Sequence, residues 1–147
     1  MRLFGSGQPK PAPQSDDAER ARRAAEAEHS GLRCLKDGDL LQAEVEFRRC
    51  VDLQSEHALG HGYLGLTYYR LGQLAEASGE LRVALSLAPS DEVLHRTHGM
   101  ILEALGRQDD AVTAYQTAVT VNPKSARAHA ALGSLACLLY TSDAADE

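Results

Sequence analysis

The chain of 147 residues carries 15 Lys and Arg against 21 Asp and Glu, so its formal net charge is −6. This charge excludes the basic excess of a nucleic-acid-binding protein, and a composition of 44 % hydrophobic residues suits one soluble domain. Only 5 % of the residues are aromatic and Trp is absent, whereas Ala and Leu are abundant, which favours helices over strands.

The first 15 residues are rich in Pro and Gly, with Pro9, Pro11 and Pro13 at every second position. Such a segment buries too little apolar surface to offset its ordering entropy, so we predict that residues 1–15 are disordered. No apolar run suits a signal peptide, and Arg2 in place of Gly excludes myristoylation. We therefore expect a cytoplasmic protein, without a membrane or nucleic-acid partner.

The first helix is predicted to begin near Ser15, which is followed by Asp16 and Asp17. A serine hydroxyl caps exposed backbone amides, and carboxylates suit the positive end of the helix dipole. The Ala-rich, charge-balanced segment 18–29 continues this helix, and its arginines alternate with glutamates. A solvated helix face is the better interpretation of these arginines than a nucleic-acid site.

Residues 58–91 show a pattern that suits two antiparallel helices. Gly65 and Ala77 are small enough to let two backbones approach closely, and Gly72 between them can adopt the left-handed conformation that ends a helix. Pro89 then ends the second helix because it lacks an amide hydrogen. The large apolar residues predicted to fill the space around this contact are Leu64, Tyr68, Leu81, Leu85 and Leu87.

The same pattern recurs at a shift of 34 residues in both directions. Residues 92–125 carry Gly99, Gly106, Ala111, Tyr115, Ala118 and Pro123, and residues 24–57 carry Gly31, Gly38, Ala43, Phe47, Cys50 and Leu53. A further unit begins at Ala126 and includes Leu132 and Gly133. This 34-residue helix–turn–helix pattern resembles the tetratricopeptide repeat (TPR) family over residues 24–136.

The resemblance implies an all-α fold, a right-handed solenoid of antiparallel helix pairs. Within a domain spanning residues 16–136, it places three repeats at 24–57, 58–91 and 92–125, and a truncated fourth at 126–136. Because this last helix has no second helix of its own, we expect Leu132 and Leu135 to be only half covered. Self-association through the uncapped C-terminal helix is therefore predicted.

Residues 137–147 resemble the translation of a sequencing-library adapter. We predict a non-native tail here, which would make the chain an N-terminal fragment; a genuine short tail is the alternative. Without Asp143, Asp146 and Glu147 the net charge of −6 becomes −3. Neither a strong acidic nor a strong basic bias then remains.

Histidines and cysteines are the candidates for metal chemistry. His61, His95 and His129 recur every 34 residues, so successive leading helices would hold them too far apart for one zinc ion. We interpret them as residues that fill the repeat interfaces, and the pair His95 and His98 as a weak metal candidate. Cys34 and Cys50 are predicted to face inward as small hydrophobic residues.

Motifs for catalysis are absent from the sequence: it has no nucleophile motif, phosphate-binding loop or His-Glu-x-x-His. We therefore predict no catalytic residue, no metal and no cofactor.

The TPR resemblance also implies a concave groove lined by the leading helix of each repeat. The groove residues that it implies are Leu66, Tyr69, Arg70, Arg96, Met100, Glu103 and Arg127. Apolar anchors beside guanidinium groups suit a protein or peptide partner with acidic character. The alternative is that these are ordinary solvated residues on a spacer.

TPR chaperone adaptors hold a C-terminal carboxylate with Lys, Asn and Arg at fixed positions. Here those positions hold Glu28, Leu32, Tyr63, Val93 and Thr97. The resemblance therefore implies a non-enzymatic peptide-binding scaffold that lacks this clamp. The alternative is the N-terminal recruiting arm of a larger, bacterial enzyme of the glycosyltransferase, methyltransferase or sulfotransferase type.

Overall fold

The structure, a computed structural model, describes Gly7 and residues 15–145 as seven α-helices and no strand. The predicted disorder of residues 1–15 falls almost wholly outside this range. The helices are α1 (Ser15–Asp37), α2 (Leu40–Leu53), α3 (Ala58–Arg70), α4 (Leu74–Leu87), α5 (Glu92–Ala104), α6 (Gln108–Val121) and α7 (Ala126–Ala145). The predicted all-α class is confirmed.

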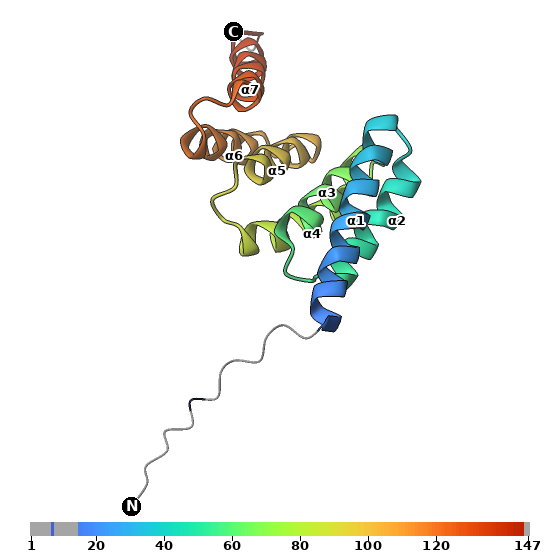
Figure 1. Cartoon of the computed structure of the whole chain (residues 1–147). Coiled ribbons are helices and arrows are strands. Elements are labelled where there is room, and N and C mark those ends of the chain that lie inside the picture. Colours follow the sequence, from blue (N-terminus) through green and yellow to red (C-terminus); the bar gives the residue numbers. More distant parts are fainter. Residues whose placement is uncertain (1–6, 8–14, 146–147) are drawn as a thin grey trace, which may run out of the picture.

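Consecutive helices pack as antiparallel pairs that stack along the chain (Figure 1). Helices α1 and α2, α3 and α4, and α5 and α6 make the largest contacts, and each pair also touches the helix that follows it. The leading helices α1, α3, α5 and α7 also contact one another in order, whereas α2, α4 and α6 make no comparable mutual contact. The chain is thus a helical repeat solenoid, as predicted, with the leading helices as its inner layer.

Glycine ends the first helix of each complete pair. Gly38, Gly72 and Gly106 have φ angles of 84°, 79° and 77°, in the left-handed region that side chains disfavour. Asp39 and Asp91 then cap α2 and α5, since their carboxylates accept hydrogen bonds from the amides of Gln42 and Leu94. The predicted turn at Gly72 is confirmed.

A second set of glycines lets the two helices of each pair touch. A Cβ atom on Gly31 would lie 2.7 Å from the Phe47 ring, and one on Gly99 would lie 2.5 Å from the Tyr115 ring. At Gly65 it would collide with Leu81 and lie 3.2 Å from the Ala77 carbonyl oxygen. At Gly133 of α7 nothing lies within 4 Å, because no described helix packs on that side.

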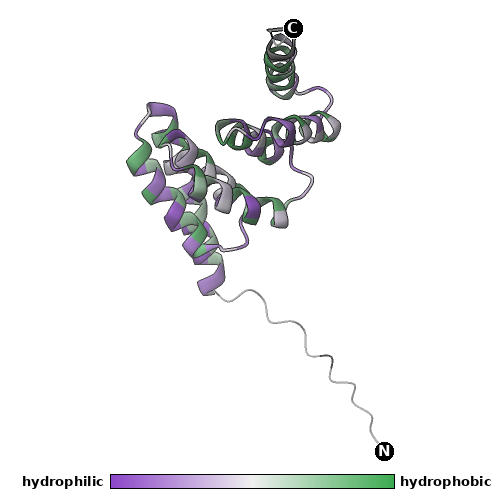
Figure 2. Ribbon diagram, turned by 180° about the vertical axis from the view of Figure 1, so that it is seen from behind, coloured by the Kyte–Doolittle hydropathy of each residue, from purple (hydrophilic) through white to green (hydrophobic). Residues whose placement is uncertain are grey.

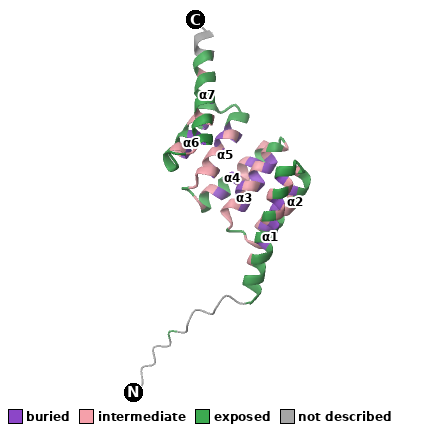
Figure 3. Cartoon of the chain, turned by 45° about the horizontal axis from the view of Figure 1, so that its top comes forward, coloured by how far each residue is buried: buried purple, intermediate pink, exposed green. Residues whose placement is uncertain are grey.

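The buried side chains between these helices form two main hydrophobic clusters. One joins Phe47, Leu64, Tyr68 and Leu81 to Leu94 and Ile101, and the other gathers Leu102, Tyr115 and Leu135. Figure 3 shows this burial as purple positions between the helices, while the far part of α7 is exposed. In Figure 2, hydrophilic and hydrophobic positions alternate along α1 and α2, and Leu41 and Val45 of α2 are exposed.

Two predictions about apolar side chains are wrong. Leu87 is 39 % exposed and does not fill the helix contact, because it is the last residue of α4, where the chain leaves the stack. Leu135 is only 1 % exposed, since α7 packs on α6 and brings it against Leu102 and Tyr115. The exposed apolar residues of α7 are instead Leu138 and Tyr140.

Helix α7 continues without a break from Ala126 through residues 137–145 of the predicted tail. Among the described residues, no helix combines the length and the apolarity that a bilayer crossing requires.

Candidate functional site

The predicted groove residues all lie on leading helices, namely α3, α5 and α7. We call the surface to which they belong the leading-helix face; its members are Leu66, Tyr69, Arg70, Arg96, Met100, Glu103 and Arg127. Arg70, Glu103 and Arg127 are exposed, whereas the other four are half-buried. Half-buried apolar residues between exposed charges can contact a ligand without being part of the core.

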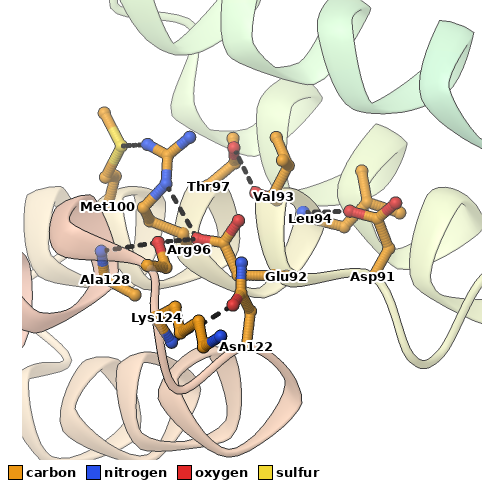
Figure 4. Close-up of polar contacts among 11 residues, drawn as sticks. Asp91, Glu92, Val93, Leu94, Arg96, Thr97, Met100, Asn122, Lys124 and Ala128 are labelled. Carbon is orange, nitrogen blue, oxygen red and sulfur yellow. Dashed lines mark hydrogen bonds and ion pairs between the residues drawn. The ribbon is translucent and has the colours of Figure 1, made fainter.

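Arg96 is held within the protein by its neighbours (Figure 4). Its Nε atom lies 3.4 Å from Glu92 Oε1, and its Nη1 atom lies 3.9 Å from the Met100 sulfur. The same Glu92 oxygen accepts a 2.8 Å hydrogen bond from Ser125 Oγ, which in turn accepts one from the Ala128 amide at 3.2 Å. Arg96 therefore lies at ion-pair distance from the Glu92 carboxylate that links α5 to the start of α7, although its buried Nε atom makes no hydrogen bond among the described residues.

Glu103 also has a partner inside the protein. Its Oε2 atom accepts a 2.9 Å hydrogen bond from the Tyr115 hydroxyl of α6. Burial, and then this bond, raise the pKa of Tyr115 well above its usual range. The hydrogen bond joins α5 to α6 at the end of the face that Glu103 occupies.

The remaining predicted residues are divided between two ends of the face. Arg70 donates a 2.9 Å hydrogen bond from Nη1 to the Leu35 carbonyl oxygen near the end of α1, yet stays exposed. Leu66 packs against the core. Arg127 lies exposed in the first turn of α7. The structure thus brings Arg96 and Met100 of α5 into contact, whereas Tyr69 and Arg70 lie on α3 and Arg127 lies on α7.

The positions of the carboxylate clamp have other roles in this chain. Glu28 Oε2 lies 2.7 Å from His57 Nε2, and the Tyr63 ring stacks on Phe47 with centroids 5.5 Å apart. Thr97 is only 3 % exposed and donates a hydrogen bond to the Val93 carbonyl oxygen. None of these groups offers a cation to a terminal carboxylate.

The recurring histidines have a role that the spacing did not reveal. The Nε2 atoms of His61, His95 and His129 lie 3.0, 2.7 and 2.8 Å from the carbonyl oxygens of Ser55, Pro89 and Pro123, respectively. A carbonyl oxygen only accepts, so each Nε2 carries a proton and fixes the loop before its helix. Because the acceptors are backbone oxygen atoms, no residue type in the sequence marks this role.

The pair His95 and His98 lines a cavity of about 270 Å³ with Leu102, Arg107 and Asp110. Burial, and then the charges of His95 and Arg107, lower the pKa of His98 from its ordinary value of 6.5. Because the unfolded chain binds this proton more readily, the stability that neutral His98 contributes is lost progressively as the pH falls from 6.5 through the lower pKa of the folded state. The structure thus favours a neutral, structural His98.

A cluster that sequence reasoning missed joins the first repeat to the second. Glu28, Cys50 and His57 each place a ligand-type atom within 4.8 Å of the other two. Cys50 is fully buried, as predicted, and burial followed by the Glu28 charge raises its pKa to about 11. Their separation in the sequence gives no motif.

Two family models match the chain. A tetratricopeptide repeat model matches residues 31–92, and a TPR repeat model matches residues 99–135. The chain belongs to the tetratricopeptide repeat family. No curated protein matches the sequence of this TPR chain.

Solved TPR domains share the fold of this TPR chain at low sequence identity. The first TPR domain of human RPAP3 is 19 % identical with a TM-score of 0.78, over 84 % of this chain and 97 % of that one. The first TPR of Spaghetti (RPAP3), bound to the HSP90 peptide SRMEEVD, is 19 % identical with a TM-score of 0.76, over 82 % and 95 %.

A third match is part of a much longer protein. A mutant of the Thermobaculum terrenum O-GlcNAc transferase is 24 % identical with a TM-score of 0.76 over 81 % of this TPR chain, which spans only 22 % of that protein.

Proposed function

We propose that this TPR chain is a non-enzymatic interaction module that binds a peptide segment of a partner on the leading-helix face. The observation that carries the proposal is that the leading helices expose both apolar residues and cations: Tyr69 and Met100 are half-buried on α3 and α5, and Arg70 and Arg127 are exposed on α3 and α7. Aromatic and Met side chains beside arginines are enriched in interfaces. The HSP90 peptide bound to the first TPR of Spaghetti gives a precedent for this use of the fold.

The ligand that this face suits is an internal acidic segment. Arg70 and Arg127 can pair with carboxylates, whereas Arg96 is already paired with Glu92 and contributes less. Because Glu28, Tyr63 and Thr97 occupy the clamp positions, the ligand needs no free C-terminus. We propose that binding takes place in the cytoplasm and needs no cofactor, membrane or nucleic acid.

The test uses peptides selected from a random library displayed with both ends blocked. Arg127→Glu is expected to weaken binding of selected acidic peptides about tenfold, which is about 1.4 kcal/mol, because repulsion replaces attraction. Tyr69→Ala is expected to cost about 1–2 kcal/mol as an anchor is lost. Isothermal titration calorimetry measures both effects.

The matched control is Arg82→Glu, an identical change of charge at an exposed position of α4, outside the leading-helix face. It should leave the affinity unchanged. Equal losses from Arg82→Glu and Arg127→Glu would show a nonspecific charge effect and refute the proposed face. Arg96→Glu is unsuitable because it would place two carboxylates together and disturb the start of α7.

We also propose that the chain as printed, with the predicted tail that contains Leu138 and Tyr140, associates weakly with a second copy through the exposed part of α7. Leu138 and Tyr140 are 58 % and 77 % exposed, and the side of Gly133 is open. The sedimentation coefficient should therefore rise with protein concentration, and Leu138→Glu should abolish the rise. Leu41→Glu, at a leucine of α2 that is 70 % exposed, is the matched control and should behave as the wild type. A monomer at every concentration would contradict this proposal.

A second candidate function is the recruiting arm of a larger enzyme. The match to part of the O-GlcNAc transferase mutant favours it, since this chain spans 22 % of that protein. Sequencing the source gene across the codon of Ala136 tests it and the predicted tail together. A reading frame that continues into a catalytic domain supports the arm, whereas a stop codon soon after the repeats refutes it.

A further inference from the structure

The cluster of Glu28, Cys50 and His57 lies where three separate elements meet. Glu28 belongs to α1, Cys50 to α2, and His57 directly precedes α3. Their ligand-type atoms lie within 4.8 Å of one another, and Glu28 Oε2 and His57 Nε2 are 2.7 Å apart. We propose that these three side chains bind a divalent transition-metal ion, zinc by preference, that links the first repeat to the second.

The donor set suits this ion. Imidazole nitrogen, thiolate sulfur and carboxylate oxygen are the ligands of protein zinc, at about 2.0–2.3 Å from the metal. For a tetrahedral ion these bond lengths place the ligand atoms about 3.3–3.6 Å apart. The Glu28 and His57 atoms would separate slightly, and the sulfur would need to approach by at most about 1.2 Å, within reach of side-chain rotation.

The surroundings leave room and access. A Cβ atom on Gly60 would lie 2.9 Å from His57 Cδ2 and 3.2 Å from the Cys50 sulfur, so glycine there keeps the cluster uncrowded. Cys50 is fully buried, whereas the side chains of His57 and Glu28 are 30 % and 22 % exposed. A cavity of about 320 Å³ adjoins His57, lined also by Leu53, Gln54, Ser55 and Glu56. Solvent can therefore supply the ion and the fourth ligand, a water molecule.

Charge balance makes a metal-bound Cys50 thiolate more favourable than an unbound one. On binding, the Cys50 thiol loses its proton to solvent, and neutral His57 coordinates through Nε2. The thiolate and the Glu28 carboxylate then neutralise the two charges of the cation, so no net charge is buried. In the metal-free protein the same residues form a hydrogen bond and an apolar contact, and the experiment distinguishes this simpler role.

The sequence predicted no metal because the histidines that recur every 34 residues lie too far apart to share one ion. His61, His95 and His129 each bond a backbone carbonyl oxygen, and His57 is not one of them. The three ligands converge only because α1 and α2 pack against the start of α3.

Titration of the full chain with Co²⁺ tests the proposal, because a bound thiolate gives a sulfur-to-cobalt charge-transfer absorption. The protein should carry Cys137→Ser, which removes an exposed thiol. We expect one equivalent of Co²⁺ to give this absorption and Zn²⁺ to abolish it. Cys50→Ala should eliminate the band, and Glu28→Gln and His57→Gln should each weaken binding about tenfold or more, since loss of groups that merely support ligands already costs 10–100-fold.

Three matched controls lie in the same repeat. Cys34→Ala, Glu26→Gln and His29→Gln change the same residue types outside the cluster and should leave the titration unchanged. Absence of the band in the Cys137→Ser protein, shown to be folded by circular dichroism, would overturn the proposal, as would an undiminished band after Cys50→Ala is added. Glu28→Gln keeps a partner for His57 and conserves side-chain size, so it remains informative if Cys50→Ala fails to fold.

Discussion

Phe47→Ala is expected to lower the free energy of unfolding by about 3–5 kcal/mol. The Phe47 ring is fully buried, lies against the backbone of Gly31 and stacks on Tyr63 of the next repeat. Truncation removes these contacts and leaves a cavity at a place where two repeats and both helices of the first repeat meet. Urea denaturation followed by circular dichroism measures the loss.

Leu41→Ala is the control for Phe47→Ala. Leu41 lies on the same helix but is 70 % exposed, so its truncation should change the unfolding free energy by less than about 0.5 kcal/mol. In a stack of repeats the damage should also be local, and hydrogen exchange should accelerate first in α1 and α2. Equal effects of the two substitutions would show that Phe47 is not central to this core.

The sequence predicted the helix pairs well because the features that define them are local. Gly72 is needed by the turn itself, and Gly65 by the close contact between its two helices, so each records a steric requirement. Leu87 and Leu135 were misplaced because their burial depends on how far a neighbouring helix extends over them. A repeat template states which residue faces inward but not what lies opposite.

The leading-helix face was only partly predictable for the same reason. Its positions follow from the repeat, but the template could not show that Arg96 pairs with Glu92 and that Glu103 accepts a bond from Tyr115. These partners reduce the number of cations available to a ligand, so Arg70 and Arg127 are the cations expected to contact it. The cluster of Glu28, Cys50 and His57 could not be predicted because residues so far apart in the sequence form no motif.

Gly99→Ala is expected to destabilise the protein by about 1–3 kcal/mol, although Ala is the better helix former by about 1 kcal/mol. The new methyl carbon would lie 2.5 and 2.6 Å from atoms of the Tyr115 ring. This ring is 1 % exposed and its hydroxyl is bonded to Glu103, so it cannot move aside without losing packing or the hydrogen bond. Urea denaturation gives the magnitude.

Gly133→Ala is the matched comparison, because Gly133 holds the same place in its repeat. No atom of the described residues lies within 4 Å of its missing Cβ, so the helix preference of Ala should act alone and stabilise α7 by up to about 1 kcal/mol. The same substitution at equivalent positions should thus have opposite signs, because a second helix packs against only one of them. If both substitutions stabilise the protein, the contact between Gly99 and Tyr115 is looser than the structure shows; if both destabilise it, another helix or a second copy covers Gly133 in solution.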